Sequence, residues 1–147
     1  MNNLPVISFD FETRSDVDIT KCGSYAYIHS PNFNPLLLSY SIDDGEVQTV
    51  DFTKTEVTQP FLYHWREILW SREYLKTAYN VAFEREVWSV LLLGERSPID
   101  QWQDTQVLAA YAGLPRRLAD VGPALGLPED KQKLKTGNDL IRFFCVP

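Results

Sequence analysis

The chain has 147 residues, of which 44% are hydrophobic and 23% are charged, and this balance is typical of one folded domain rather than of a disordered or fibrous chain. Its net charge of -6 argues against a protein that coats nucleic acid by bulk electrostatic attraction. Two cysteines and two histidines without metal-ligand spacing exclude thiol-zinc chemistry, and without a long apolar run or a signal-peptide profile we expect a cytoplasmic protein that does not enter a membrane.

The first third of the chain predicts three successive strands. Residues 6–11 alternate weakly between apolar and polar side chains, and residues 36–42 form a mostly apolar run that is typical of a buried strand. Asp43, Asp44 and Gly45 then predict a tight hairpin turn, in which Gly45 supplies the positive φ, leading into a strand over residues 46–52. The chain is therefore expected to begin with an antiparallel sheet.

The remainder of the chain alternates between helix and strand patterns. Thr58 is a candidate N-cap for a helix whose apolar residues recur at helical spacing through Leu69. A short strand follows over residues 75–79, then a helix that Gly94 ends, a further helix around residues 107–111, and a segment rich in Gly and Pro through Leu125. This order predicts one α/β domain over residues 1–147 with crossover units after the antiparallel start.

Two acidic residues end the first predicted strand. Asp10 and Glu12 are two positions apart, so their side chains point to the same face of the strand. Carboxylates held side by side repel each other and are stabilised by a cation, a proton or a basic partner. Mg²⁺ and Mn²⁺ prefer oxygen ligands, so a divalent metal is one interpretation, and neutralisation by Arg14 is the other.

A third acid lies where the short strand over residues 75–79 meets the next helix. Within Asn80–Glu84, the carboxylate of Glu84 is expected in the first helical turn, where it could simply complement the positive end of the helix dipole. Phe83 is then expected to belong to the core. The combination of this acid with the Asp10 and Glu12 pair favours a shared carboxylate site instead.

These two segments resemble known exonuclease motifs. Ile7–Thr13 resembles the first motif, Asp-x-Glu, of the DEDD-superfamily 3′–5′ exonucleases, and Asn80–Glu84 resembles their second motif, Asn-x-x-x-Asp. Trp102–Thr105 and Leu118–Leu127 also look like segments of that group. The sequence is most similar to the proofreading domain of phage-type family A (polymerase I-like) DNA polymerases. This resemblance implies a ribonuclease H-like fold, a mixed sheet with flanking helices.

The resemblance also implies a reaction and a site. It implies two-metal-ion hydrolysis of phosphodiester bonds at single-stranded DNA 3′ ends, with Mg²⁺ or Mn²⁺ held by Asp10, Glu12 and Glu84. The resemblance also implies positions that support the metal ligands or contact the substrate, and these are Asn80, Phe83, Thr13 and Asp104. The implied setting is DNA replication in a bacterial or phage-infected cell, with the remainder of a polymerase as a partner in cis or in trans.

The sequence departs from the family pattern at two points. Glu84 stands where the superfamily has Asp, and no Tyr-x-x-x-Asp or His-x-x-x-Asp segment supplies the third motif. We therefore expect a domain that is incomplete at its C-terminus, without the helix that carries this motif, and impaired in activity. One alternative is an inactive nucleic-acid-binding or assembly module with the same fold. Another is a protein-interaction fragment with exposed apolar surface.

Three further features leave two interpretations each. Aromatic residues near the acids either stack on bases or pack in the core, and they are Phe9, Phe11, Tyr79 and Phe83. The basic tract of Lys131, Lys133 and Lys135 either guides a phosphate backbone or is a solvated loop. Asp104 is either an acid close to the metal site or the N-cap of the helix that it precedes.

Overall fold

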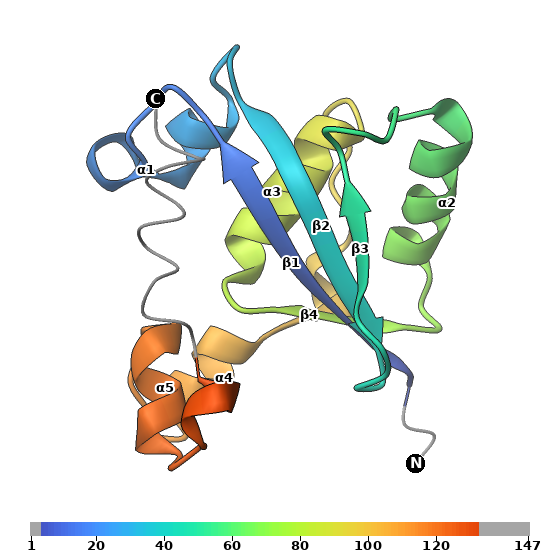
Figure 1. Cartoon of the computed structure of the whole chain (residues 1–147). Helices are drawn as coiled ribbons and strands as arrows, with labels where there is room; N and C mark the ends of the chain where they lie inside the picture. Colours follow the sequence, from blue (N-terminus) through green and yellow to red (C-terminus); the bar gives the residue numbers. More distant parts are fainter. Residues whose placement is uncertain (1–3, 133–147) are drawn as a thin grey trace.

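The computed structural model describes residues 4–132 and contains a five-stranded mixed sheet with strand order β3-β2-β1-β4-β5 (Figure 1). The strands are β1 (Val6–Arg14), β2 (Asn34–Ile42), β3 (Gln48–Asp51), β4 (Leu75–Ala78) and β5 (Trp102–Asp104). The helices are α1 (Ile19–Ile28), α2 (Gln59–Trp70), α3 (Val81–Leu91), α4 (Thr105–Tyr111) and α5 (Leu118–Ala124), with short 3₁₀ turns at Ile99–Gln101 and Glu129–Lys131. Within residues 4–132, no helix is long and apolar enough to cross a membrane.

The central strand β1 pairs antiparallel with β2 and parallel with β4. β2 also pairs antiparallel with β3, and β4 pairs parallel with β5. The mixed sheet that the sequence predicted, with an antiparallel start and later crossover units, is confirmed. The ends of β1 and β4 that meet the candidate site therefore lie side by side.

The first three strands do not follow one another directly, because α1 lies between β1 and β2. Asp18 caps this helix by accepting a hydrogen bond from the Thr20 backbone N–H at 2.9 Å. Gly23, at φ 77° and ψ 168°, interrupts the helical backbone. The interruption removes the continuous apolar stripe that identifies a helix in a sequence, and the prediction of three successive strands was wrong for that reason.

The hairpin between β2 and β3 forms as predicted, but a different residue type supplies its backbone conformation. Asp43 and Asp44 have positive φ values of 49° and 57°, whereas Gly45 does not. The Gly45 N–H donates to the Ile42 carbonyl oxygen at 2.9 Å. A Cβ at Gly45 would lie 2.9 Å from that oxygen, so glycine is needed here for space. The role predicted for Gly45 was therefore wrong.

The helix predictions for the second half hold where the apolar pattern is strong. Thr58 caps α2, its hydroxyl accepting from the Phe61 N–H at 3.4 Å, and α3 ends before Gly94. The segment rich in Gly and Pro contains a helix, α5, with Pro123 in its last turn. The three-residue strand β5 was not expected from the sequence.

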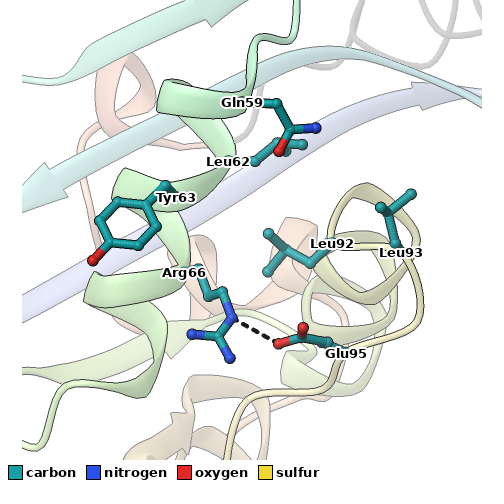
Figure 2. A pocket seen from close by; sticks show the side chains of 7 residues that line it. All are labelled: Gln59, Leu62, Tyr63, Arg66, Leu92, Leu93 and Glu95. Atoms are coloured by element: carbon teal, nitrogen blue, oxygen red, sulfur yellow. Dashed lines mark hydrogen bonds and ion pairs between the residues drawn. The ribbon is translucent and has the colours of Figure 1, made fainter.

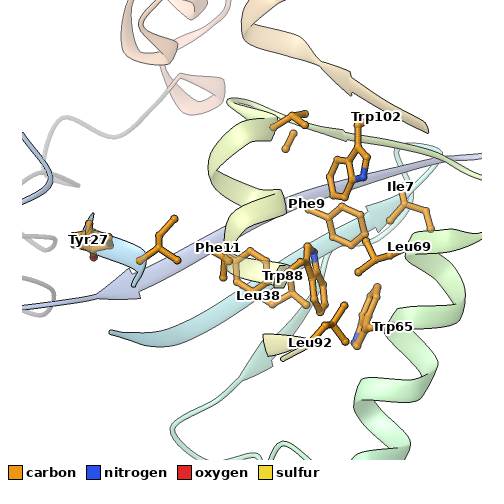
Figure 3. Packing of buried hydrophobic residues seen from close by; sticks show 14 residues of the cluster. Ile7, Phe9, Phe11, Tyr27, Leu38, Trp65, Leu69, Trp88, Leu92 and Trp102 are labelled. Carbon is orange, nitrogen blue, oxygen red and sulfur yellow. The ribbon is translucent and has the colours of Figure 1, made fainter. Parts of the chain in front are cut away.

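The core lies between β1 and the two helices α2 and α3, and six of its fourteen buried residues in the described part of the chain are aromatic (Figure 3). The Phe9 ring meets Trp65 at 5.7 Å and Trp88 at 5.9 Å between centroids, and the Phe11 ring meets Trp88 at 5.2 Å. Buried edge-to-face contacts of this kind contribute about 0.5–1.5 kcal/mol each beyond burial. Core packing is therefore the confirmed role of Phe9 and Phe11, which fixes the orientation of β1.

Candidate carboxylate site

Asp10 and Glu12 lie on the face of β1 that points away from the aromatic core. Burial alternates along the strand, so the flanking Phe9 and Phe11 are buried while both acids are exposed. Asp10 pairs with Ser39 of β2, and the register with β2 shifts between Glu12 and Thr13. A bulge at this point bends the strand and re-aims the adjacent side chains. The two acids thus share a face, as the alternation predicted.

Glu84 lies in the first turn of α3 and is buried, with 4% of its surface exposed. Burial and the negative charge of Asp10 raise the pKa of Glu84 to about 9, Glu12 adds to the rise, and a hydrogen bond from the Phe11 backbone N–H opposes it. The Glu84 Oε2 atom has no hydrogen-bond partner within the described residues. Glu84 therefore does more than complement the helix dipole at an exposed helix end, because it is buried and interacts electrostatically with both acids of β1.

The three acids do not form a ready-made metal centre. Across residues 4–132, no three His, Cys, Asp or Glu side chains are grouped closely enough to hold a metal ion. The chemistry of the donors nevertheless fits a hard divalent cation, since all three offer carboxylate oxygens and Glu84 has an unpartnered buried one. The structure therefore brings the acids near one another without completing a coordination set.

Asp104 is a helix cap, as one of its two interpretations predicted, and it serves two helices. Its Oδ1 accepts from the N–H groups of Gln106 at 2.8 Å and Val107 at 3.2 Å, at the start of α4. It also accepts from Val81 at 2.9 Å and Asn80 at 3.4 Å, at the start of α3. The carboxylate therefore fixes the N-terminus of α3, three residues before Glu84.

The remaining candidate residues surround the start of α3 and the end of β1. Asn80 is exposed, its backbone adopts the left-handed conformation at φ 83°, and its side chain does not cap the helix. Phe83 is half-buried, packs against the core and faces the Tyr27 ring at 6.3 Å. Thr13 is buried, and its hydroxyl oxygen lies 3.1 Å from the Tyr27 hydroxyl oxygen. This contact with Tyr27 had no counterpart in the sequence pattern.

Two predicted features lie at or beyond the edge of the site. The hydroxyl of Tyr79, the residue before Asn80, donates to the Arg116 carbonyl oxygen at 2.7 Å. Of the basic tract, Lys131 is exposed in a 3₁₀ turn, and Lys133 and Lys135 lie outside the described residues.

A shallow pocket of about 150 Å³ lies elsewhere, between α2 and the C-terminal end of α3 (Figure 2). Arg66 crosses it to Glu95, with Nε and Oε2 2.8 Å apart. None of the three candidate carboxylates lines this pocket. The candidate carboxylate site is therefore separate from this pocket.

The order and pairing of the strands are those of a ribonuclease H-like fold. Apo exonuclease I superposes with a TM-score of 0.56 at 14% identity, over 89% of this chain and 39% of that chain. A zinc-bound complex of E. coli exonuclease I with single-stranded DNA superposes with a TM-score of 0.54 at 12% identity, over 97% of this chain and 41% of that one. These likenesses establish the fold.

The particular relationship is to a phage DNA polymerase. The chain is 39% identical over 148 residues to a DNA polymerase of Bacillus phage SP02, an alignment that covers 98% of this chain. It spans 21% of the length of that polymerase. No protein-family model matches the sequence. The resemblance to exonuclease domains of phage polymerases is thus confirmed.

Proposed function

We propose that the chain is a 3′–5′ proofreading exonuclease domain that hydrolyses phosphodiester bonds at single-stranded DNA 3′ ends. The observation that carries this proposal is the buried carboxyl of Glu84, which feels the charges of Asp10 and Glu12 and whose Oε2 has no hydrogen-bond partner within residues 4–132. A neutral buried acid next to two exposed acids is a costly arrangement for a purely structural site, and it is relieved when a cation binds all three. Kinship with a phage polymerase and the exonuclease fold support the same function.

In this proposal Asp10, Glu12 and Glu84 hold Mg²⁺ or Mn²⁺. A bound pair of ions would lower the pKa of the attacking water and stabilise the leaving 3′ oxygen. Glu84 releases its proton when the cation binds, because the charged carboxylate is the ligand form. The proposal also assigns contacts with the terminal nucleotides to Asn80 and Phe83, at the N-terminus of α3.

The proposal assigns the third-motif Asp to the remainder of a polymerase, in cis or in trans. No group of three metal ligands is assembled within residues 4–132, and this favours a second candidate function, a non-catalytic module that binds single-stranded DNA. The two functions differ in their need for metal. Binding of single-stranded DNA in EDTA, without any degradation in Mn²⁺, is the result expected of the non-catalytic module.

The test is degradation of a 5′-labelled single-stranded oligonucleotide in Mn²⁺ by the wild-type chain and by Asp10→Ala. We expect a ladder that shortens from the 3′ end and is lost in the variant. Asp100→Asn is the matched control, because Asp100 is an exposed acid that pairs with Arg72 at the opposite end of β4 and β5. A ladder that persists in Asp10→Ala, or no ladder in the wild type, would contradict exonuclease function for this chain.

A further inference from the structure

The helix α1 contacts both of the elements that carry the candidate acids. On the β1 side, the hydroxyl of Tyr27 donates to the Thr13 carbonyl oxygen at 3.0 Å. The Thr13 hydroxyl oxygen lies 3.1 Å from the Tyr27 hydroxyl oxygen. Both residues are buried. Thr13 directly follows Glu12, so this contact holds the end of the strand that carries Glu12.

The end of β1 needs such a contact, because its pairing with β2 is irregular there. The register shifts between Glu12 and Thr13, and Thr13 is paired with Pro35, which has no backbone N–H to donate. A buried carbonyl without a donor is destabilising by about 1–3 kcal/mol. The Tyr27 hydroxyl donates to the Thr13 carbonyl oxygen at this irregular end of the strand.

On the α3 side, α1 makes two contacts next to Glu84. The Tyr27 ring faces Phe83 at 6.3 Å between centroids, and Phe83 directly precedes Glu84. Two residues after Tyr27, at the C-cap of α1, His29 Nε2 lies 2.6 Å from Oε1 of Glu86, which is two residues after Glu84. A single helix is therefore tied to residues that neighbour Glu12 and to residues that neighbour Glu84.

We propose that Tyr27 is a positioning residue, which sets the spacing between Glu12 on β1 and Glu84 on α3 by contacting the neighbour of each. The coupling of β1 to α3 through Tyr27 is independent of any ligand. Its consequence for cation binding rests on the function proposed above, because the spacing of the two carboxylates then determines how well they share an ion.

The test compares Tyr27→Phe with Tyr25→Phe. The first variant removes the buried hydroxyl and keeps the ring, and the second removes the hydroxyl of an exposed tyrosine on the same helix. Amide hydrogen exchange of the metal-free chain reports on the coupling, and titration with Mn²⁺ followed by electron paramagnetic resonance reports on the site. Circular dichroism checks that each variant is folded.

For Tyr27→Phe we expect amide exchange to speed up about fivefold both at residues 11–14 and at residues 81–85, the factor for loss of one hydrogen bond. We also expect the Mn²⁺ dissociation constant to rise about tenfold, as for loss of a group that orients a metal ligand. Tyr25→Phe should match the wild type in both measurements.

Two results would overturn the inference: faster exchange confined to α1 and the end of β1, or Mn²⁺ affinity equal to that of the wild type. The latter result would leave the proposed function standing. If the wild type binds no Mn²⁺ while exchange changes in both segments, the proposed function fails and the coupling through Tyr27 holds.

Discussion

Replacing Glu84 by glutamine should stabilise the metal-free protein at neutral pH. The pKa of this carboxyl is about 9 in the folded chain against an ordinary value of 4.5, so between these two pH values the folded state binds a proton that the unfolded state lacks. Stability therefore falls as pH rises through this window, by about 1.4 kcal/mol per pH unit. From pH 4.5 to pH 7 the loss is at most about 3 kcal/mol.

Glutamine is neutral at every pH, so Glu84→Gln should not show this loss. For a domain of this size the gain at pH 7 corresponds to an increase in Tm of up to about 6–12 °C. Thermal unfolding followed by circular dichroism in EDTA, at pH 5 and at pH 8, measures it. The wild type should lose stability between the two pH values while the variant remains nearly constant.

Glu86→Gln is the control, because Glu86 lies on the same helix and is paired. Its Oε1 accepts from Arg96 at 2.7 Å and lies 2.6 Å from His29 Nε2, so removing its charge should destabilise the chain modestly at pH 7. If Glu84→Gln behaved like Glu86→Gln, or kept the wild-type pH slope, Glu84 would not be a buried neutral acid in the folded chain.

Two further predictions concern residues outside the carboxylates. Asp104→Ala should lower the free energy of unfolding by about 1–3 kcal/mol, since one carboxylate caps both α3 and α4. Asp104→Asn should avoid most of this loss, because its amide oxygen still accepts. Urea unfolding measures both variants, and equal losses would contradict the capping role. Lys76 is fully buried, and burial lowers the pKa of its amine to about 8, with the Arg72 charge adding to the effect. The Lys76 contribution to stability should therefore rise between pH 8 and pH 10.5, where the unfolded chain holds a proton that the folded chain lacks, and it should oppose the fall caused by Glu84 up to about pH 9. In urea unfolding at pH 7.5 and pH 10, Lys76→Met should therefore lose more stability than the wild type between the two pH values.

The sequence predicted the elements whose apolar residues repeat at a regular spacing. α2 and α3 were predicted because their buried residues fall on one helical face, and β1 because its burial alternates. α1 was missed because Gly23 interrupts it, and β5 because three residues are too few for a pattern. In each case the regular spacing of apolar residues along the chain, or its absence, decided whether the element was predicted.

Local spacing also determined how much of the site could be predicted. The shared face of Asp10 and Glu12 follows from strand alternation, and the place of Glu84 in a first helical turn follows from its neighbours. The burial of Glu84 does not, because it depends on how α3 packs on β1. The second cap made by Asp104 likewise depends on the pairing of Asp104 with Ala78, which joins β5 to β4 at the start of α3.

The aromatic contacts that stabilise the core also keep the three acids close enough to repel one another. Phe9 and Phe11 are fixed by Trp65 and Trp88, so β1 cannot rotate to move Asp10 away from α3 without breaking buried ring contacts. Glu84 is fixed in turn by the capped start of α3. The electrostatic repulsion among the acids is thus held in place by packing, and protonation of Glu84 relieves it in the metal-free chain. A cation that replaced this proton would relieve the repulsion among the three carboxylates, and this relief would favour its binding. Because only the folded state holds the acids together, the cation would also stabilise the fold.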